Sequence, residues 1–334
     1  MTQRSARLKI AAAAFLAASA LAGQALAFGD KEVARRTSFG GSCVKCELSG
    51  RNLAGAHIIG ANFSGAALVG ANLRDARFQA SSFEGADLSR ADLTDAGMSG
   101  ANFSNANLSS ARLRAAEAHG VHFGSANLTK ADFTDADATG AMFQKAVMVG
   151  VVLRSAELRG GMFDSADLTK AVLTDANAAG ANFSRATLRG ASFRSASLKA
   201  ANLQKVDATG AVFQDADLTA AMLSHGRFDK ASFRSAELRG ASMSHASFDG
   251  ADFRDANLRR AMIGGADLSG ARGLTQEQVD EACADSRTRL PAGLTGKGCQ
   301  GVRVIVKPPR PPAPPAPPSS PEGPRYIITL GPSD

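Results

Sequence analysis

Ala71-Asn72-Leu73-Arg74-Asp75 and Ala86-Asp87-Leu88-Ser89-Arg90 are two copies of the five-residue unit that decides the fold of this chain. From Leu48 to Leu268, every fifth residue lies in one unbroken frame of 45 central sites, occupied by 21 Leu, 15 Phe, 3 Met, 2 Ile and 4 Ala. Two residues before each central site, 37 of the 45 positions are Ala. The unit is therefore Ala-(Asn/Asp/Ser)-(Leu/Phe)-x-x.

A period of five residues fits neither an α-helix nor a flat strand. In a helix, successive central residues would rotate by about 140° around the axis, and in a strand they would alternate between faces. The chain must instead turn once in every five residues. Short units that cannot bury a face alone have to stack, so the repeat predicts a solenoid.

A second, longer period shows how many units make one coil. One aromatic column and one aliphatic column recur at every fourth unit, which indicates that four units close a square coil. After Phe183 the aromatic column restarts half a coil later, at Phe193, Phe213, Phe233 and Phe253. The predicted core columns contain Phe63, Phe83, Phe103, Phe123, Phe143, Phe163 and Phe183, and Leu68, Leu88, Leu108 and Leu128.

These units resemble the pentapeptide-repeat family over about two-thirds of the chain. The resemblance implies an all-β fold, a right-handed quadrilateral β-helix in which the central Leu or Phe and the preceding Ala point inward. About 11 coils at the roughly 4.8 Å spacing of neighbouring strands would give a rod about 53 Å long. We expect thin packing at the four central sites that hold Ala, which are Ala118, Ala138, Ala178 and Ala208.

The N-terminal stretch resembles a secretory signal. Arg4, Arg7 and Lys9 precede an apolar run over residues 10–21, and Ala25-Leu26-Ala27 forms a small-x-small cleavage site. The run of about 12 residues is shorter than the roughly 20 that span a bilayer. We therefore expect an exported protein, periplasmic or secreted, that has no integral membrane segment after cleavage.

The chain divides into five predicted segments. They are a signal peptide (1–27), an N-terminal cap with a Cys-x-x-Cys pair (28–47), the repeat solenoid (48–272), a C-terminal cap with a short helix and a Cys pair (273–301), and a Pro-rich tail (302–334). Thr275 to Cys283 is predicted to be helical, with Thr275 as N-cap, Gln278 at N3 and a staple between Leu274 and Val279. Such a helix would cover the open sheet edge.

Four cysteines lie near the two ends of the predicted rod. A disulfide needs Cα atoms within about 7 Å, so only Cys43 with Cys46 and Cys283 with Cys299 can pair within one chain. An oxidising compartment favours structural disulfides at both places. A redox Cys-x-x-Cys is the alternative at the first pair, but the sequence lacks the βαβ context of such motifs.

The outward positions show one ordered pattern of charge. Five arginines recur once in every two coils, and Asp95, Asp135, Asp175 and Asp215 lie on the coils between them, so we expect ion pairs along the stack. An anion-binding stripe is the alternative. His225 and His245 lie one coil apart, below Lys205, and His119 and His122 are less suggestive. The arginines of this surface ladder are Arg74, Arg114, Arg154, Arg194 and Arg234.

The composition argues against several functions. Residues 47–272 contain 24 Lys/Arg and 23 Asp/Glu, so no strong field of one sign attracts or imitates nucleic acid. The chain has no Trp and one Tyr, which leaves out the usual aromatic platforms for glycans and single strands. We find no Ser/His/Asp constellation, and we expect no catalytic residue, no cofactor and no metal.

The sequence favours a non-enzymatic scaffold of the envelope or periplasm that binds an unknown protein partner or envelope component through flat faces. An end-to-end homodimer is left open. Binding of an anionic envelope polymer or membrane surface through the basic flanks is the alternative. Some cytosolic relatives in the family imitate DNA and inhibit DNA gyrase, but this chain is near neutral and carries a signal, so that function is disfavoured.

Overall fold

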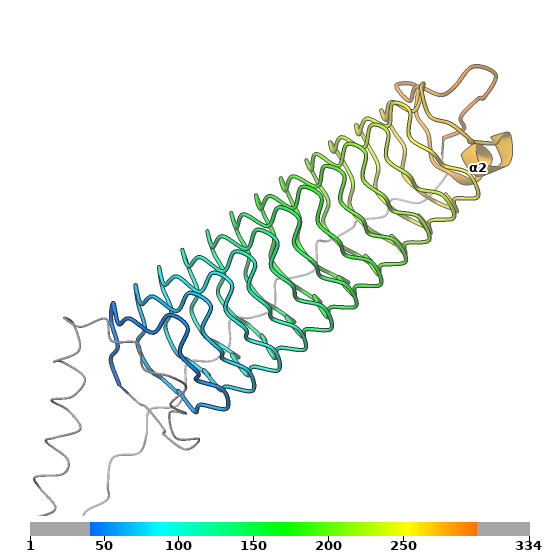
Figure 1. Ribbon diagram of the computed structural model, residues 1–334. Coiled ribbons are helices and arrows are strands. Elements are labelled where there is room, and N and C mark those ends of the chain that lie inside the picture. Colours follow the sequence, from blue (N-terminus) through cyan, green and yellow to red (C-terminus); the bar gives the residue numbers. More distant parts are fainter. Residues whose placement is uncertain (1–40, 299–334) are drawn as a thin grey trace, which may run out of the picture.

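The computed structural model describes residues 41–298, which wind into a long rod of stacked coils (Figure 1). Parallel bridges join each outward residue to its counterpart four units later, from Ser42 with Asn62 to Asp252 with Arg272. The bridges form four ladders, so four five-residue units make one coil, as the longer period predicts. The predicted signal peptide and Pro-rich tail lie outside the described residues.

Backbone hydrogen bonds hold each coil to its neighbours. The central Leu68 N–H donates to the Asp87 carbonyl on the following coil at 2.7 Å, and the Asp87 N–H donates back to the Ala66 carbonyl at 2.9 Å. A third bond joins Gly70 N–H to the Ser89 carbonyl at 2.8 Å. The same three bonds recur along the rod, and they satisfy the backbone groups that stacking would otherwise bury unpaired.

A tight turn follows each central residue. In one such turn the Ala71 N–H donates to the Leu68 carbonyl at 3.0 Å. The fifth residue of the unit has a positive φ at all 45 positions from Lys45 to Gly265, of which 17 are Gly and 28 are other residues. A positive φ at the third turn position is the requirement of a type II turn. The sequence therefore tolerates many residues where glycine would be the least strained.

Gly210 and Ala220 offer a matched test of this turn. Gly210 has φ 70° and open space where a Cβ would lie, whereas Ala220 adopts φ 57° at an equivalent position. Gly210→Ala should lower the free energy of unfolding by about 1 kcal/mol because only the backbone conformation opposes the methyl group. Ala220→Gly should raise it by a smaller amount. Urea unfolding followed by circular dichroism measures both, and changes of the same sign would contradict the assigned turn.

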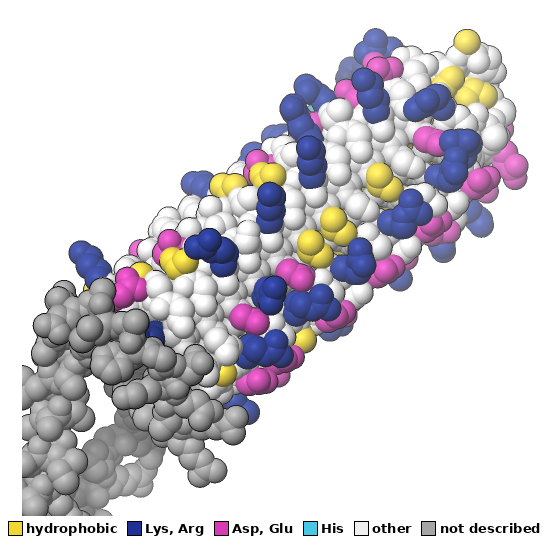
Figure 2. All heavy atoms as spheres, viewed as in Figure 1, with side chains coloured by type: hydrophobic (Ala, Val, Ile, Leu, Met, Phe, Trp, Pro, Cys, Tyr) yellow, Lys and Arg dark blue, Asp and Glu magenta, His cyan; other side chains and the backbone are white. Residues whose placement is uncertain are grey.

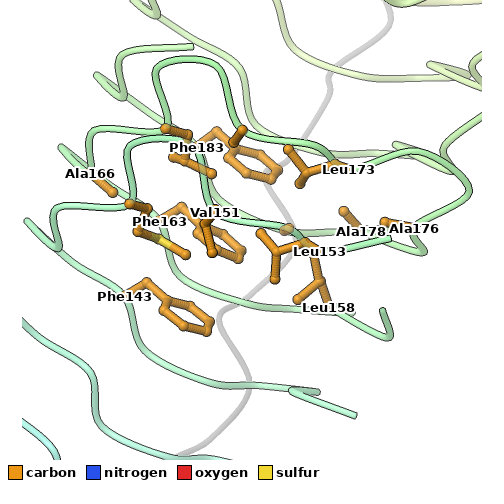
Figure 3. Packing of buried hydrophobic residues seen from close by; sticks show 14 of the residues in the cluster. Phe143, Val151, Leu153, Leu158, Phe163, Ala166, Leu173, Ala176, Ala178 and Phe183 are labelled. Carbon is orange, nitrogen blue, oxygen red and sulfur yellow. The ribbon is translucent and has the colours of Figure 1, made fainter. Parts of the chain in front are cut away.

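The core contains two kinds of column along the rod axis. The rings from Phe63 to Phe183 stack face to face, with centroids 4.7 to 5.5 Å apart and interplanar angles of 3 to 22°. Figure 3 shows Phe143, Phe163 and Phe183 in this stack, with leucines of other faces beside them. Four residues of the predicted aliphatic column are also buried, at 1% exposure or less: Leu68, Leu88, Leu108 and Leu128.

The aromatic column changes face once. Phe183 meets Phe193 edge-on, with centroids 5.9 Å apart and rings at 88°, and a second stack then runs through Phe213 and Phe233 to Phe253. This is the half-coil shift that the sequence predicts. An edge-on contact keeps the favourable quadrupole geometry across the change of direction.

The four central alanines lie at fully buried positions, each with 0% exposure. Two of them share a coil with two phenylalanines instead of one. Ala118 is followed at the next three central sites by Phe123, Leu128 and Phe133, and Phe133 lies edge-on to Phe123 at 5.7 Å. The coil from Ala178 to Phe193 repeats this arrangement. A second ring therefore compensates for the small side chain in these two coils.

The C-terminal end of the rod carries α2 (Gln276–Glu281), which lies against the last coils (Figure 1). Thr275 is its N-cap, and a complete capping box joins Thr275 and Gln278, as predicted. The helix ends two residues earlier than predicted, because Ala282 is extended and the Cys283 N–H returns to the sheet, donating to the Ala261 carbonyl at 2.8 Å. Among residues 41–298, no helix has the length and apolarity that crossing a membrane requires.

Candidate interaction surface

One of the four long faces contains all five arginines of the predicted surface ladder. We call it the charged face. It consists of one bridge ladder together with the two turn residues that follow each of its members, and Figure 2 shows how basic and acidic side chains intermingle along the rod. The ladder residues from the N-terminal end are Asn52, Asn72, Asp92, Arg112, Asp132, Val152, Val172, Ser192, Val212, Ser232, Asp252 and Arg272.

Outward Asp and Asn side chains brace the turns that follow them. Asp92 Oδ1 accepts hydrogen bonds from the Thr94 N–H at 3.1 Å and from the Thr94 hydroxyl at 2.5 Å. Asp132 does the same with Thr134. These Asx-type bonds explain why Asn and Asp precede the central residue so often. They also fix the carboxylate, which leaves Oδ2 directed toward a neighbouring side chain.

Arginines of the ladder pair with these fixed carboxylates on the next coil. Arg74 contacts Asp92 Oδ2 and Asp95 Oδ2, each at 3.6 Å. Arg114 repeats the pattern with Asp132 at 3.5 Å and Asp135 at 3.8 Å. For these two arginines the sequence predicted only Asp95 and Asp135 as partners and missed Asp92 and Asp132. The repeat could have shown them, because each lies on the bridge ladder of the coil that follows its arginine.

The pattern continues at the C-terminal end of the face but is interrupted in the middle. Arg234 lies 3.9 Å from Asp252 Oδ2, again on the ladder of the following coil. Arg154 and Arg194 are exposed, and the corresponding ladder residues on the coils that follow them are Val172 and Val212. Within the described part of the chain, neither arginine has a carboxylate oxygen within 4.0 Å. Asp175 and Asp215, the partners that the sequence suggested for them, are exposed and do not reach that distance.

Asp252 is the most strongly held carboxylate of the charged face. Arg254 Nε donates to Asp252 Oδ1 at 2.9 Å, and its Nη2 donates to Oδ2. This hydrogen bonding from Arg254 is the main cause that lowers the pKa of Asp252 from 3.8 to about 2, and the charges of Arg254 and Arg234 act in the same direction. The side chain is 14% exposed, so the carboxylate is partly shielded from water.

The depressed pKa of Asp252 predicts a pH-dependent contribution to stability. The ionised carboxylate favours the folded state, so its contribution is complete above the ordinary pKa of 3.8 and disappears as the pH falls toward about 2. Asp252→Asn should therefore be less stable than the native protein at pH 7, and most of the difference should be lost by pH 2. Urea midpoints of both proteins at pH 7, 4 and 2 measure this. A difference that stays constant down to pH 2 would contradict it.

The histidine pair lies on the face opposite the charged face. The rings of His225 and His245 stack with centroids 5.2 Å apart and an interplanar angle of 13°. His119 is separate and lies 3.3 Å from Asp137. The described residues contain no group of three or more His, Cys, Asp or Glu side chains placed to hold a metal ion.

The structure confirms one of the two predicted disulfides. Cys43 and Cys46 form a disulfide at the first turn of the rod, with Cα atoms 5.2 Å apart. Cys283 is disulfide-bonded as well. Cys299 lies outside the described residues, so its pairing with Cys283 stays a prediction.

Comparisons with known proteins agree with this architecture. A family model described as "Pentapeptide repeats (8 copies)" matches the chain at residues 43–75, 71–109, 106–144, 131–169, 166–204, 196–234 and 236–272. These matches cover well over half of the chain. A search of curated proteins finds no match.

Several solved structures are similar to this chain. HetL, a pentapeptide repeat protein involved in heterocyst differentiation regulation in the cyanobacterium Nostoc, is 29% identical, with 72% of this chain and 92% of HetL covered and a TM-score of 0.34. QnrB1, a plasmid-mediated fluoroquinolone resistance protein, is 22% identical over 54% of this chain and 91% of its own, with a TM-score of 0.40. A pentapeptide repeat protein of the Arabidopsis thaliana thylakoid lumen is 31% identical over 33% and 69%, with a TM-score of 0.20.

Proposed function

The chain belongs to the pentapeptide-repeat family, whose fold is a right-handed β-helix, and we propose that it is a non-enzymatic scaffold of the cell envelope or periplasm. The observation that carries this proposal is the uninterrupted set of four bridge ladders from residue 42 to residue 272. They hold outward side chains at a fixed spacing of about 4.8 Å on flat faces. A rod of about 11 coils, some 53 Å long, can hold bound partners at defined distances.

The charge distribution on the rod favours protein partners over polyanions. Ion pairs such as Arg74 with Asp92 and Arg189 with Asp207 place acidic and basic groups side by side on different faces. A phosphate-rich polymer would meet a carboxylate beside many of the cations, and imitation of DNA would require a predominantly acidic surface. Binding of an anionic polymer through the basic flanks remains the alternative function.

Export is part of the proposal. The predicted signal peptide at residues 1–27 supports it, and so does the Cys43–Cys46 disulfide, since disulfides persist in oxidising compartments. The Pro-rich tail at residues 302–334 would serve as an extended tether or a docking peptide beyond the end of the rod. Cell fractionation with an antibody against the mature protein locates it, and a purely cytoplasmic signal would overturn the export.

The scaffold role is tested by in-cell crosslinking of the mature protein, with and without residues 302–334, followed by mass spectrometry. We expect the full chain to capture a protein partner. Retention of that partner by the truncated chain would assign recognition to the faces of the rod, whereas its loss would assign recognition to the tail. Capture of no protein by either form would overturn the protein-scaffold role and favour an envelope polymer.

A further inference from the structure

The interruption in the middle of the charged face creates an ordered pattern of exposed charges. Arg154, Asp175, Arg194 and Asp215 lie on four successive coils, so positive and negative side chains alternate at steps of about 4.8 Å along the rod. Arg74, Arg114 and Arg234 have a carboxylate within 4.0 Å on the next coil. For Arg154 and Arg194, the bridge-ladder residue on the next coil is a valine, Val172 or Val212, and not an aspartate.

Read in the opposite direction, this series of charges has the opposite sign at every coil, so it can pair with a second, reversed copy of itself. A two-fold axis that runs parallel to the strands, between the coils of Asp175 and Arg194, brings each coil against its counterpart in a second, antiparallel copy. Arg154 then meets Asp215 of the other copy, and Asp175 meets Arg194. An isologous interface requires this kind of self-complementary surface.

The side chains of the bridge ladder also match across this two-fold axis. Around the same axis Val152 lies opposite Val212, and Val172 lies opposite Ser192, so the centre of the contact is mainly aliphatic. Opposite charges also meet on two of the three coil pairs farther out, Asp132 and Asp135 with Arg234, and Asp92 and Asp95 with Arg272. On the pair between them, Arg112 and Arg114 lie opposite a mixed group of Asp252, Arg254 and Asp255, in which Arg254 is already paired with Asp252.

We propose that two copies of this chain associate side by side and antiparallel through their charged faces. A parallel pair has its two-fold axis along the rod and reverses the strand direction, so Arg154 and Asp175 would not meet the opposite charges that the antiparallel pair gives them. Stacking of coil on coil at the C-terminal end would have to displace α2, which is bonded to the last coils. The inference goes beyond the proposed function, because a scaffold can act without self-association.

The size of the face is compatible with a specific but salt-sensitive dimer. Ten coils from Asp92 to Arg272 extend over about 48 Å, and five residues per face give a width of up to about 17 Å. The product is roughly 800 Å² per copy, similar to the about 800 Å² that standard interfaces bury on each partner. An aliphatic centre with a charged rim is also the usual arrangement of such interfaces.

Sedimentation velocity of the mature protein tests the association. We expect a dimer at low ionic strength and dissociation near 1 M salt, where the screening length falls to about 3 Å. Arg154→Asp with Arg194→Asp should raise the dissociation constant at least tenfold, because like charges then meet. Adding Asp175→Arg and Asp215→Arg should restore the dimer. The control is Lys145→Asp with Lys205→Asp, which makes the same change of charge on the opposite face and should leave the dimer intact.

Crosslinking between single cysteines tests the orientation. Ser195 and Ser235 are exposed at the edge of the charged face. In the antiparallel dimer the two Ser195 positions lie about 11 Å apart and the two Ser235 positions about 26 Å apart, given sheets stacked at about 10 Å. A bismaleimide with a span of about 10 Å should therefore join Ser195→Cys chains and not Ser235→Cys chains.

Each remaining outcome overturns the dimer. Equal crosslinking at both sites would indicate a parallel pair, and crosslinking at neither site would exclude the charged face. A protein that sediments as a monomer at low salt, or whose fourfold charge exchange fails to restore association, would also overturn it. A monomer that still captures a protein partner in cells would leave the scaffold function standing.

Discussion

Phe163→Ala is expected to lower the free energy of unfolding by about 3–5 kcal/mol. The Phe163 ring has 0% exposure and stacks between Phe143 and Phe183, with both centroid distances 4.7 Å. Removing the ring deprives both neighbours of a stacking partner. Hydrogen-bonded coils on either side cannot move together to close the resulting cavity. Urea unfolding followed by circular dichroism measures the loss as a lower midpoint.

Phe63→Ala is the matched control for this substitution. Phe63 lies at the N-terminal end of the same column, is 6% exposed, and has one stacked neighbour, Phe83, at 5.0 Å. We expect about half the loss seen at Phe163, because less contact disappears and the end coil can relax. Equal losses at the two positions, or a loss below about 1 kcal/mol at Phe163, would show that the stacked column does not dominate the core.

The core was predictable from the sequence because its geometry repeats. Each central residue occupies the same position in its five-residue unit. Central residues that are four units apart therefore lie above one another and form a column along the rod. The step from Phe183 to Phe193 appears in the structure where the pattern shifts. The capping box at Thr275 was equally local, since it depends on two side chains three residues apart.

The contacts of the surface were less predictable. Periodicity placed Arg74 and Asp95 on neighbouring coils, but an arginine side chain is long enough to cross to the bridge ladder, where Asp92 is held by its turn. The interruption at Val172 and Val212 becomes meaningful only when this second carboxylate is known. The end of α2 was misplaced for a related reason: the sheet pairing of Cys283 with Met262 ends the helix, and that contact is distant in sequence.

Gln278→Ala is expected to lower the free energy of unfolding by about 2–3 kcal/mol and to loosen the C-terminal end of the rod. Gln278 Nε2 donates to the Phe253 carbonyl at 2.9 Å and to the Ala256 carbonyl at 2.8 Å. Its Oε1 accepts from the Thr275 N–H at 2.8 Å. One side chain thus completes the capping box and joins α2 to the last coils. Hydrogen exchange should show faster exchange around residues 253–267, since solenoid units depend on their neighbours.

Gln278→Glu separates the two roles of this side chain. The carboxylate still accepts from Thr275 N–H and suits the positive end of the helix, but it cannot donate to the two carbonyls and places a negative charge against them. We therefore expect Gln278→Glu to be at least as destabilising as Gln278→Ala. Glu277→Ala, at the neighbouring exposed position, should change stability by less than about 0.5 kcal/mol. If Gln278→Glu instead retained native stability, the capping box alone would hold α2, and the bonds to Phe253 and Ala256 would contribute nothing measurable.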